Sequence, residues 1–175
     1  MSCVSIPALT TIFLQPGEHF MGDASCRIRT LLGSCVSITL WHPVRRVGAM
    51  SHFLLPSRSR PHAGDLDGHY ADESLLILLQ ELADIEVMPT QCVGKIFGGG
   101  EMFPGQARSA NPSVGTLNGE AARALLQSYR IPIVAESLFG LGHRQIVFDI
   151  GSGNVWARQV KPVDPHLGPS QEKIS

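Results

Sequence analysis

Two short apolar runs on either side of residues 42–45 constrain the fold of this chain more than any other feature. The sequence from Leu31 to Pro56 reads LLGSCVSITLWHPVRRVGAMSHFLLP, and each run alternates along its length. Alternation with a period of two is typical of β-strands, and a proline between two such runs favours a turn. The stretch therefore predicts an antiparallel hairpin.

The turn length fixes the predicted register. A four-residue loop at 42–45 would pair Trp41 with Arg46. One face of the hairpin would then be mostly apolar and buried; it holds Val36, Ile38, Leu40, Val47, Ala49 and Ser51. On the other face Cys35 would lie opposite His52, and directly opposed residues have Cβ atoms about 4.5–5.5 Å apart.

A thiol beside an imidazole suggests a nucleophile with its base, because the thiolate is the reactive form and a neighbouring histidine favours it. Gly33 and Ser34 precede Cys35 and suggest a turn whose free backbone N–H groups can hold a developing oxyanion. The alternative is structural: Cys35 is a small core residue and His52 a buried histidine with its hydrogen bonds satisfied.

Further motifs follow the hairpin in a fixed order. They are HYADESLLILL, KIFGGGEMF, VGTLN and GHRQIVFD, and with LGSC and GAMSHFLLP they span about residues 25–160. This ordered set resembles the CheD family, the chemoreceptor glutamine deamidases of bacterial chemotaxis. The resemblance implies a cysteine hydrolase without a cofactor that converts receptor glutamine side chains to glutamate. It also implies a layered α-β-β-α sandwich.

The resemblance also implies roles for single residues. Cys35 would be the nucleophile, His52 the general base, and a threonine shortly before the cysteine the third catalytic residue, for which Thr30 is the candidate. Some members have one more residue between that threonine and LGSC, so an ungapped alignment would put Arg29 there. The implied partners are the cytoplasmic part of chemotaxis receptors and, in some bacteria, a chemotaxis phosphatase.

Length and composition set broader limits. The 175 residues predict one domain over residues 1–161 and a flexible tail over 162–175. A net charge of −1 argues against nucleic acid as a partner. The four cysteines form no CxxC pair, which fits a reducing cytoplasm. The N-terminus does not resemble a signal peptide, and no apolar run is long enough to insert into a membrane.

The remaining pattern predicts an α+β fold with mixed or antiparallel sheets and two main helices. The helices are expected at 70–85 and 114–129, the second with Leu117, Ala121, Leu125 and Leu126 on its inner face. Strands are expected at 7–14, 91–97 and 131–137, and a final hairpin at 144–150 and 154–160. Residues 27–31 are expected to lead into the first hairpin.

Several other residues are candidates for the site. We expect the substrate cleft to be lined by Tyr70 and by the triple glycine Gly98, Gly99 and Gly100. The glycines do not fit a phosphate-binding loop, because no Lys-Ser/Thr follows them. Tyr70 is equally well explained as an aromatic residue at the core edge. Arg144 is expected at the surface, although it could also anchor a loop or meet an acidic receptor.

Four histidines raise the question of a metal site. His42, His52, His62 and His69 match no compact ligand spacing, so no metal is predicted. The loops at 57–69 and 98–106 are expected to grip the receptor.

The sequence also leaves two other functions open. A non-catalytic adaptor that binds receptors or the phosphatase would not need both Cys35 and His52. A transglutaminase-like acyl transferase would use an amine in place of water. For the deamidase, hydrolysis of glutamyl methyl esters is a secondary prediction, because the ester is chemically similar to the amide.

Overall fold

The predicted hairpin forms the centre of the fold. A computed structural model describes residues 8–60, 64–103 and 110–162. The two runs are strands β4 (Val36–His42) and β5 (Val47–Ser51), which pair antiparallel. Six of the seven β4 residues are buried, because this strand is covered on both faces.

The register differs from the predicted one by two residues. His42 pairs with Val47 and Leu40 with Ala49, so the loop spans 43–46 instead of 42–45. The backbone N–H of Arg46 donates to the His42 carbonyl at 2.9 Å, and Arg46 takes a left-handed conformation with φ 52° that ends the turn. A shift by two residues leaves every side chain on its predicted face, since side chains alternate with a period of two.

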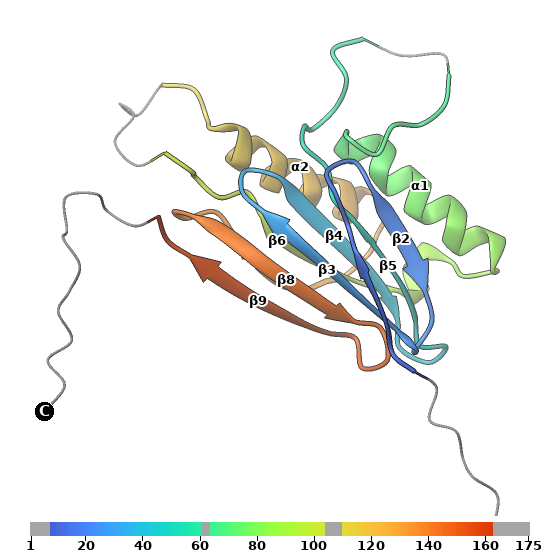
Figure 1. The fold of residues 1–175 in the computed structure, drawn as a ribbon. Coiled ribbons are helices and arrows are strands. Elements are labelled where there is room, and N and C mark those ends of the chain that lie inside the picture. The colour runs from blue at the N-terminus through green and yellow to red at the C-terminus, as the bar shows by residue number, and fades with distance from the viewer. Residues whose placement is uncertain (1–7, 61–63, 104–109, 163–175) are drawn as a thin grey trace, which may run out of the picture.

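Two sheets stack on each other (Figure 1). The first has the order β2-β5-β4-β6-β7, and the second has the order β1-β3-β8-β9. Both sheets are mixed, because β1 pairs parallel with β3 and β6 parallel with β7. The other bounds are β1 Thr10–Phe13, β2 His19–Gly22, β3 Cys26–Leu32, β6 Val93–Gly98, β7 Ile133–Leu138, β8 His143–Asp149 and β9 Asn154–Val160.

The helices α1 (Ala71–Asp84) and α2 (Val114–Ser128) lie side by side on the outer face of the five-stranded sheet (Figure 1). The α+β class, the two helices and the mixed sheets are therefore confirmed. The α-β-β-α layering is wrong: the described residues form three layers, α-β-β, and leave the outer face of the four-stranded sheet without a helix. On that face Phe13, Leu31 and Trp156 are about half exposed.

Each interface between layers has its own apolar core. Between the helices and the first sheet lie Ile38, Leu40, Leu75, Leu78 and Leu126 with their neighbours. Between the two sheets lie Ile28, Leu32, Met50, Phe97, Ile146 and Phe148, with Cys35 packed against them. The face of the hairpin that carries Cys35 thus points into the layer between the sheets.

Most predicted elements agree with the structure to within a few residues, including the final hairpin β8-β9. The strands β2 and β3 were not predicted, since residues 27–31 were expected only to lead into the hairpin. The short 3₁₀ turn η1 (Pro89–Gln91) precedes β6. Helix α2 begins after Ser113, whose side chain accepts a hydrogen bond from the Thr116 N–H. Neither helix in the described ranges has the length and apolarity needed to cross a membrane.

The inner face of α2 was predicted incorrectly in part. The buried residues are Gly115, Asn118, Gly119, Ala122 and Leu126, whereas Leu117 is 45% exposed. Small residues on this face let the helix approach the sheet closely: a Cβ at Gly115 would lie 2.5 Å from the Gly99 carbonyl oxygen. The apolar pattern alone favoured the leucines, because it does not report which face needs small side chains.

Candidate active site

Cys35 lies in a tight turn between β3 and β4. The backbone of the triple glycine holds this turn: Gly99 N–H donates to the Cys35 carbonyl and Gly100 N–H to the Gly33 carbonyl, both at 2.9 Å. The Cys35 backbone N–H makes no hydrogen bond to another residue among those described. It is therefore a free donor beside the nucleophile.

The triple glycine lets its own backbone touch both the cysteine turn and helix α2. Gly98 has φ +114°, and a Cβ there would lie 2.2 Å from the Cys35 carbonyl oxygen. Gly99 has φ +65°, and its Cβ would lie 2.6 Å from the Gly115 carbonyl oxygen. Any side chain at these positions would push the cysteine turn or helix α2 away.

The predicted cleft wall is only partly formed by these glycines. Gly100 lines a cavity of about 310 Å³ next to the cysteine turn, whereas Gly98 and Gly99 do not line it. Ser34 lines the same cavity. The other lining residues are Glu101, Met102, Phe103, Ser113, Val114 and Gly115.

Arg144 fixes this region from the second sheet. Its side chain is 3% exposed, so the expectation of a surface charge is wrong. The guanidinium donates to the Gly98 carbonyl at 3.2 Å, to Ser137 Oγ at 3.1 Å and to the Phe139 carbonyl. Burial lowers its pKa from the ordinary value. Of the two alternatives to a surface position, the structure therefore supports the one in which Arg144 anchors a loop.

His52 follows β5 and is 2% exposed. Its Nδ1 lies 2.8 Å from Thr30 Oγ1, and the Thr30 hydroxyl donates to the Leu14 carbonyl, also at 2.8 Å. A hydroxyl has one hydrogen, so Thr30 must accept from Nδ1–H. The lone pair of the neutral ring is therefore on Nε2, which is buried and has no hydrogen-bond partner.

The structure distinguishes Thr30 from Arg29, the other candidate for the third catalytic residue. Thr30 points into the layer between the sheets and is 3% exposed, while Arg29 is exposed on the opposite face of β3. Successive strand residues point to opposite faces, so only one of the two can reach His52.

Cys35 and His52 share a face of the hairpin but are not directly opposed, because the bridge between Val36 and Phe53 sets the register. They are diagonal neighbours, which typically lie about 7–8 Å apart at Cα and closer at Cβ. No hydrogen bond joins the sulfur to Nε2 in this structure. The predicted face is therefore confirmed, and the predicted direct pairing is wrong.

Burial keeps both groups neutral. It raises the pKa of the Cys35 thiol above its ordinary value, although the backbone N–H of Cys35 opposes the shift. It lowers the pKa of His52 to about 4, against weaker raising effects of the Leu14 carbonyl and Glu18. At neutral pH the resting pair is thus a thiol and an uncharged imidazole.

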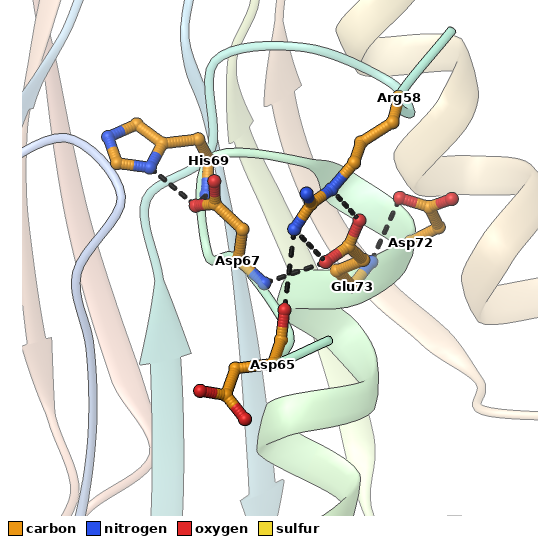
Figure 2. A network of polar contacts seen from close by, with 6 residues as sticks. All are labelled: Arg58, Asp65, Asp67, His69, Asp72 and Glu73. Atoms are coloured by element: carbon orange, nitrogen blue, oxygen red, sulfur yellow. Dashed lines mark hydrogen bonds and ion pairs between the residues drawn. The ribbon is translucent and has the colours of Figure 1, made fainter. Parts of the chain in front are cut away.

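The loop before α1 is held by a polar network (Figure 2). Arg58 binds both carboxylate oxygens of Glu73, at 2.5 and 2.9 Å, and Asp67 N–H donates to the same carboxylate. His69 Nδ1 lies 2.6 Å from Asp67 Oδ1, and the His69 carbonyl accepts from Leu54 N–H. The network therefore ties this loop to the segment that follows His52.

Tyr70 lies beside this network at the start of α1, where the Arg58 guanidinium is 5.1 Å from its ring centre. It is not among the residues that line the cavity beside Ser34. Its place in a substrate cleft stays a prediction. No group of three metal-binding side chains occurs among the described residues, and His62 lies outside them.

Sequence reasoning missed one polar residue of the site and misplaced another. Asn118 belongs to the VGTLN motif, for which the sequence predicts no role, yet its side chain donates to the carbonyls of Ser34 and Leu54. A helical spacing of four residues between Asn118 and the apolar Ala122 was the available signal for its burial. Arg144 followed the glycines of a loop, and only the folded packing shows that it is buried.

A thiol, an imidazole with a free nitrogen and an orienting hydroxyl form the set of groups that thiol-dependent hydrolases and acyl transferases use. Residues 54–159 match a family profile described as CheD chemotactic sensory transduction. The chain belongs to the CheD family.

Relatives support the same assignment over nearly the whole chain. "Probable chemoreceptor glutamine deamidase CheD 2" of Albidiferax ferrireducens is 58% identical over 159 residues, 90% of this chain and 91% of the relative. A Pseudomonas savastanoi protein named "Probable chemoreceptor glutamine deamidase CheD" is 47% identical over 84% of this chain and 83% of its own length. A more distant relative from Leptospira interrogans is 35% identical over 85% of this chain and 92% of its own.

Proposed function

We propose that this protein is a protein-glutamine deamidase that converts glutamine side chains in the cytoplasmic part of chemotaxis receptors to glutamate, with Cys35 as nucleophile. The names of the relatives support the substrate class. The observation that carries the chemistry is the fixed orientation of His52, whose Nδ1–H is bound to Thr30 and whose Nε2 is free.

In the first step the Cys35 sulfur bonds to the carbon of the glutamine carboxamide while the thiol proton passes to His52 Nε2. The raised pKa of Cys35 and the lowered pKa of His52 both disfavour proton transfer before attack. The thiol proton therefore moves to His52 while the carbon–sulfur bond forms. The carbonyl oxygen becomes an oxyanion that accepts from the Cys35 backbone N–H. One such donor is typically worth about 2.7–4 kcal/mol.

In the second step protonated His52 gives its proton to the amide nitrogen, and ammonia leaves behind a thioester. His52 then takes a proton from a water molecule, whose oxygen attacks the thioester carbon. The carbon–sulfur bond breaks, the proton returns to sulfur, and glutamate is released. Thr30 holds the ring in one tautomer throughout, because its own hydrogen is committed to the Leu14 carbonyl.

A receptor glutamine reaches Cys35 from the side of the cavity lined by Ser34 and Gly100, and the loops at 57–69 and 98–106 contact the receptor. Residues 61–63 and 104–106 of these loops lie outside the described residues. The protein acts in the cytoplasm, where the thiol stays reduced. A glutamyl methyl ester is a second substrate, and a chemotaxis phosphatase is a second partner.

Ammonia release from a receptor cytoplasmic fragment tests the proposal. Wild type is expected to release ammonia and to add about one mass unit at each modified glutamine, whereas Cys35→Ala is expected to release none. Cys26→Ala is the matched control, since Cys26 is another free and partly buried cysteine. Equal release from wild type and Cys35→Ala would contradict the deamidase function.

A non-catalytic adaptor is the alternative function, and the neutral resting state of the Cys35–His52 pair is compatible with either function. Because burial raises the pKa of Cys35, slow labelling at neutral pH is expected under both functions. Product analysis separates them: an adaptor leaves the receptor mass unchanged. The same spectrum identifies an acyl transferase, which would add the mass of the whole amine.

A further inference from the structure

Asn118 makes a pair of contacts that the mechanism above does not use. This residue of α2 has 0% exposure, and its Nδ2 donates to the Ser34 carbonyl at 3.1 Å and to the Leu54 carbonyl at 2.7 Å. Carbonyl oxygens only accept, so the amide nitrogen and not the amide oxygen must face them. The orientation of the side chain is thereby determined.

The two carbonyls lie on the two chain segments that carry Cys35 and His52. Ser34 directly precedes Cys35, and Leu54 comes two residues after His52. The nearest direct link between these segments is the backbone pair Val36–Phe53, with hydrogen bonds of 3.0 and 3.1 Å. Asn118 supplies a second link on the other side of Cys35, so the cysteine lies between two fixed points.

The contact to Ser34 also sets the direction of one N–H group. Across a planar trans peptide, the Ser34 C=O and the Cys35 N–H point in opposite directions. Asn118 holds this carbonyl towards α2, so the Cys35 N–H is directed away from the helix. That N–H has no hydrogen-bond partner in another described residue.

We propose that Asn118 is a positioning residue that orients the Ser34–Cys35 peptide so that the Cys35 N–H can bind the oxyanion. This inference rests on the proposed function, since it assigns a role in the same reaction. The inner face of α2 fits the role: a Cβ at Gly115 would lie 2.5 Å from the Gly99 oxygen, and one at Gly119 2.5 Å from the Phe139 ring. The helix is therefore close enough for a short amide side chain to reach the turn.

The test compares two reactions of the same sulfur. Deamidation forms an oxyanion, whereas alkylation by iodoacetamide does not. For Asn118→Ala and Asn118→Asp we expect kcat for ammonia release to fall about 10- to 100-fold with KM for the receptor fragment unchanged. The rate of Cys35 alkylation at pH 9 is expected to stay within about threefold of wild type.

Gln127→Glu is the matched control, an exposed amide-to-carboxylate change on the same helix that is expected to keep wild-type kcat. Circular dichroism measures the folded fraction of each variant, and both kcat and the alkylation rate are expressed per folded molecule, so partial unfolding of one variant does not enter the comparison. Having two variants guards against one that fails to fold.

The possible failures are distinguishable. Wild-type deamidation with kcat of both Asn118 variants within threefold of wild type would overturn the inference alone. A parallel fall of alkylation and deamidation would also overturn it, because that result indicates a general change of the site. A wild type without ammonia release, or an active Cys35→Ala, would overturn the proposed function and the inference with it.

Discussion

The two ring nitrogens of His52 have different surroundings, and this difference is the central feature at the scale of single residues. Nδ1 is bound to Thr30, whose hydroxyl is itself bound to the Leu14 carbonyl, and Nε2 has no partner. The chain of hydrogen bonds crosses from the first sheet to the second. It fixes the tautomer that a base for Cys35 requires.

Replacing Thr30 by valine tests this chain of hydrogen bonds. Valine keeps the shape and removes the hydroxyl, so Nδ1–H and the Leu14 carbonyl lose their partners. We expect kcat for deamidation to fall about 100-fold and the free energy of unfolding to fall by about 1–3 kcal/mol. Steady-state kinetics and urea unfolding measure the two effects.

Thr11→Val, on the exposed part of β1, is the control and is expected to leave kcat unchanged. Wild-type kcat in Thr30→Val would show that the hydroxyl has no part in the reaction.

At the scale of elements, the turn before β4 depends on backbone contact with the triple glycine. The Gly98 backbone has φ +114°, and no atom can be added there without displacing the Cys35 carbonyl. Arg144 holds the Gly98 carbonyl from β8. The position of the nucleophile is therefore set jointly by β4, β6 and the second sheet.

Gly98→Ala is expected to lower the free energy of unfolding by at least about 1–3 kcal/mol, from backbone strain alone. The displaced turn should also abolish ammonia release. Thermal unfolding by circular dichroism and the ammonia assay measure these effects.

Gly64→Ala provides the comparison for stability alone, because Gly64 is exposed and is not one of the positive-φ glycines, but it lies in the 57–69 loop that is proposed to contact the receptor. Unchanged stability and activity in Gly98→Ala would mean that the close approach of the two backbones is not required.

At the scale of the whole molecule, the active site is built between the two sheets, and its burial links the site to global stability. His52 has a pKa of about 4 when folded and an ordinary value of 6.5 when unfolded. Between these values the unfolded chain binds a proton that the folded chain does not. Stability is therefore lost as the pH falls from 6.5 towards 4.

Urea unfolding at pH 7 and pH 4 measures this linkage. Wild type is expected to lose up to about 3 kcal/mol more than His52→Gln over this range, because glutamine does not titrate while all other groups are shared. An equal loss in both proteins would show that His52 is not buried in its neutral form.

Much of the fold and of the site could be predicted from the sequence. The alternation of β4 and β5 placed Cys35 and His52 on one face, and the family resemblance implied Thr30 as the candidate for a third catalytic residue. The register could not be predicted, because patterns of period two are identical for shifts of two residues, and the left-handed Arg46 ended the loop one residue later than expected.

The sequence by itself determined the helices, most strands, the shared face of the cysteine and histidine, and the family. Only the tertiary structure decided that both helices lie on one sheet, that Arg144 is buried and that Asn118 links the segments of Cys35 and His52. These features depend on contacts between residues far apart in the chain, and local periodicity reports only which side of its own element a residue occupies.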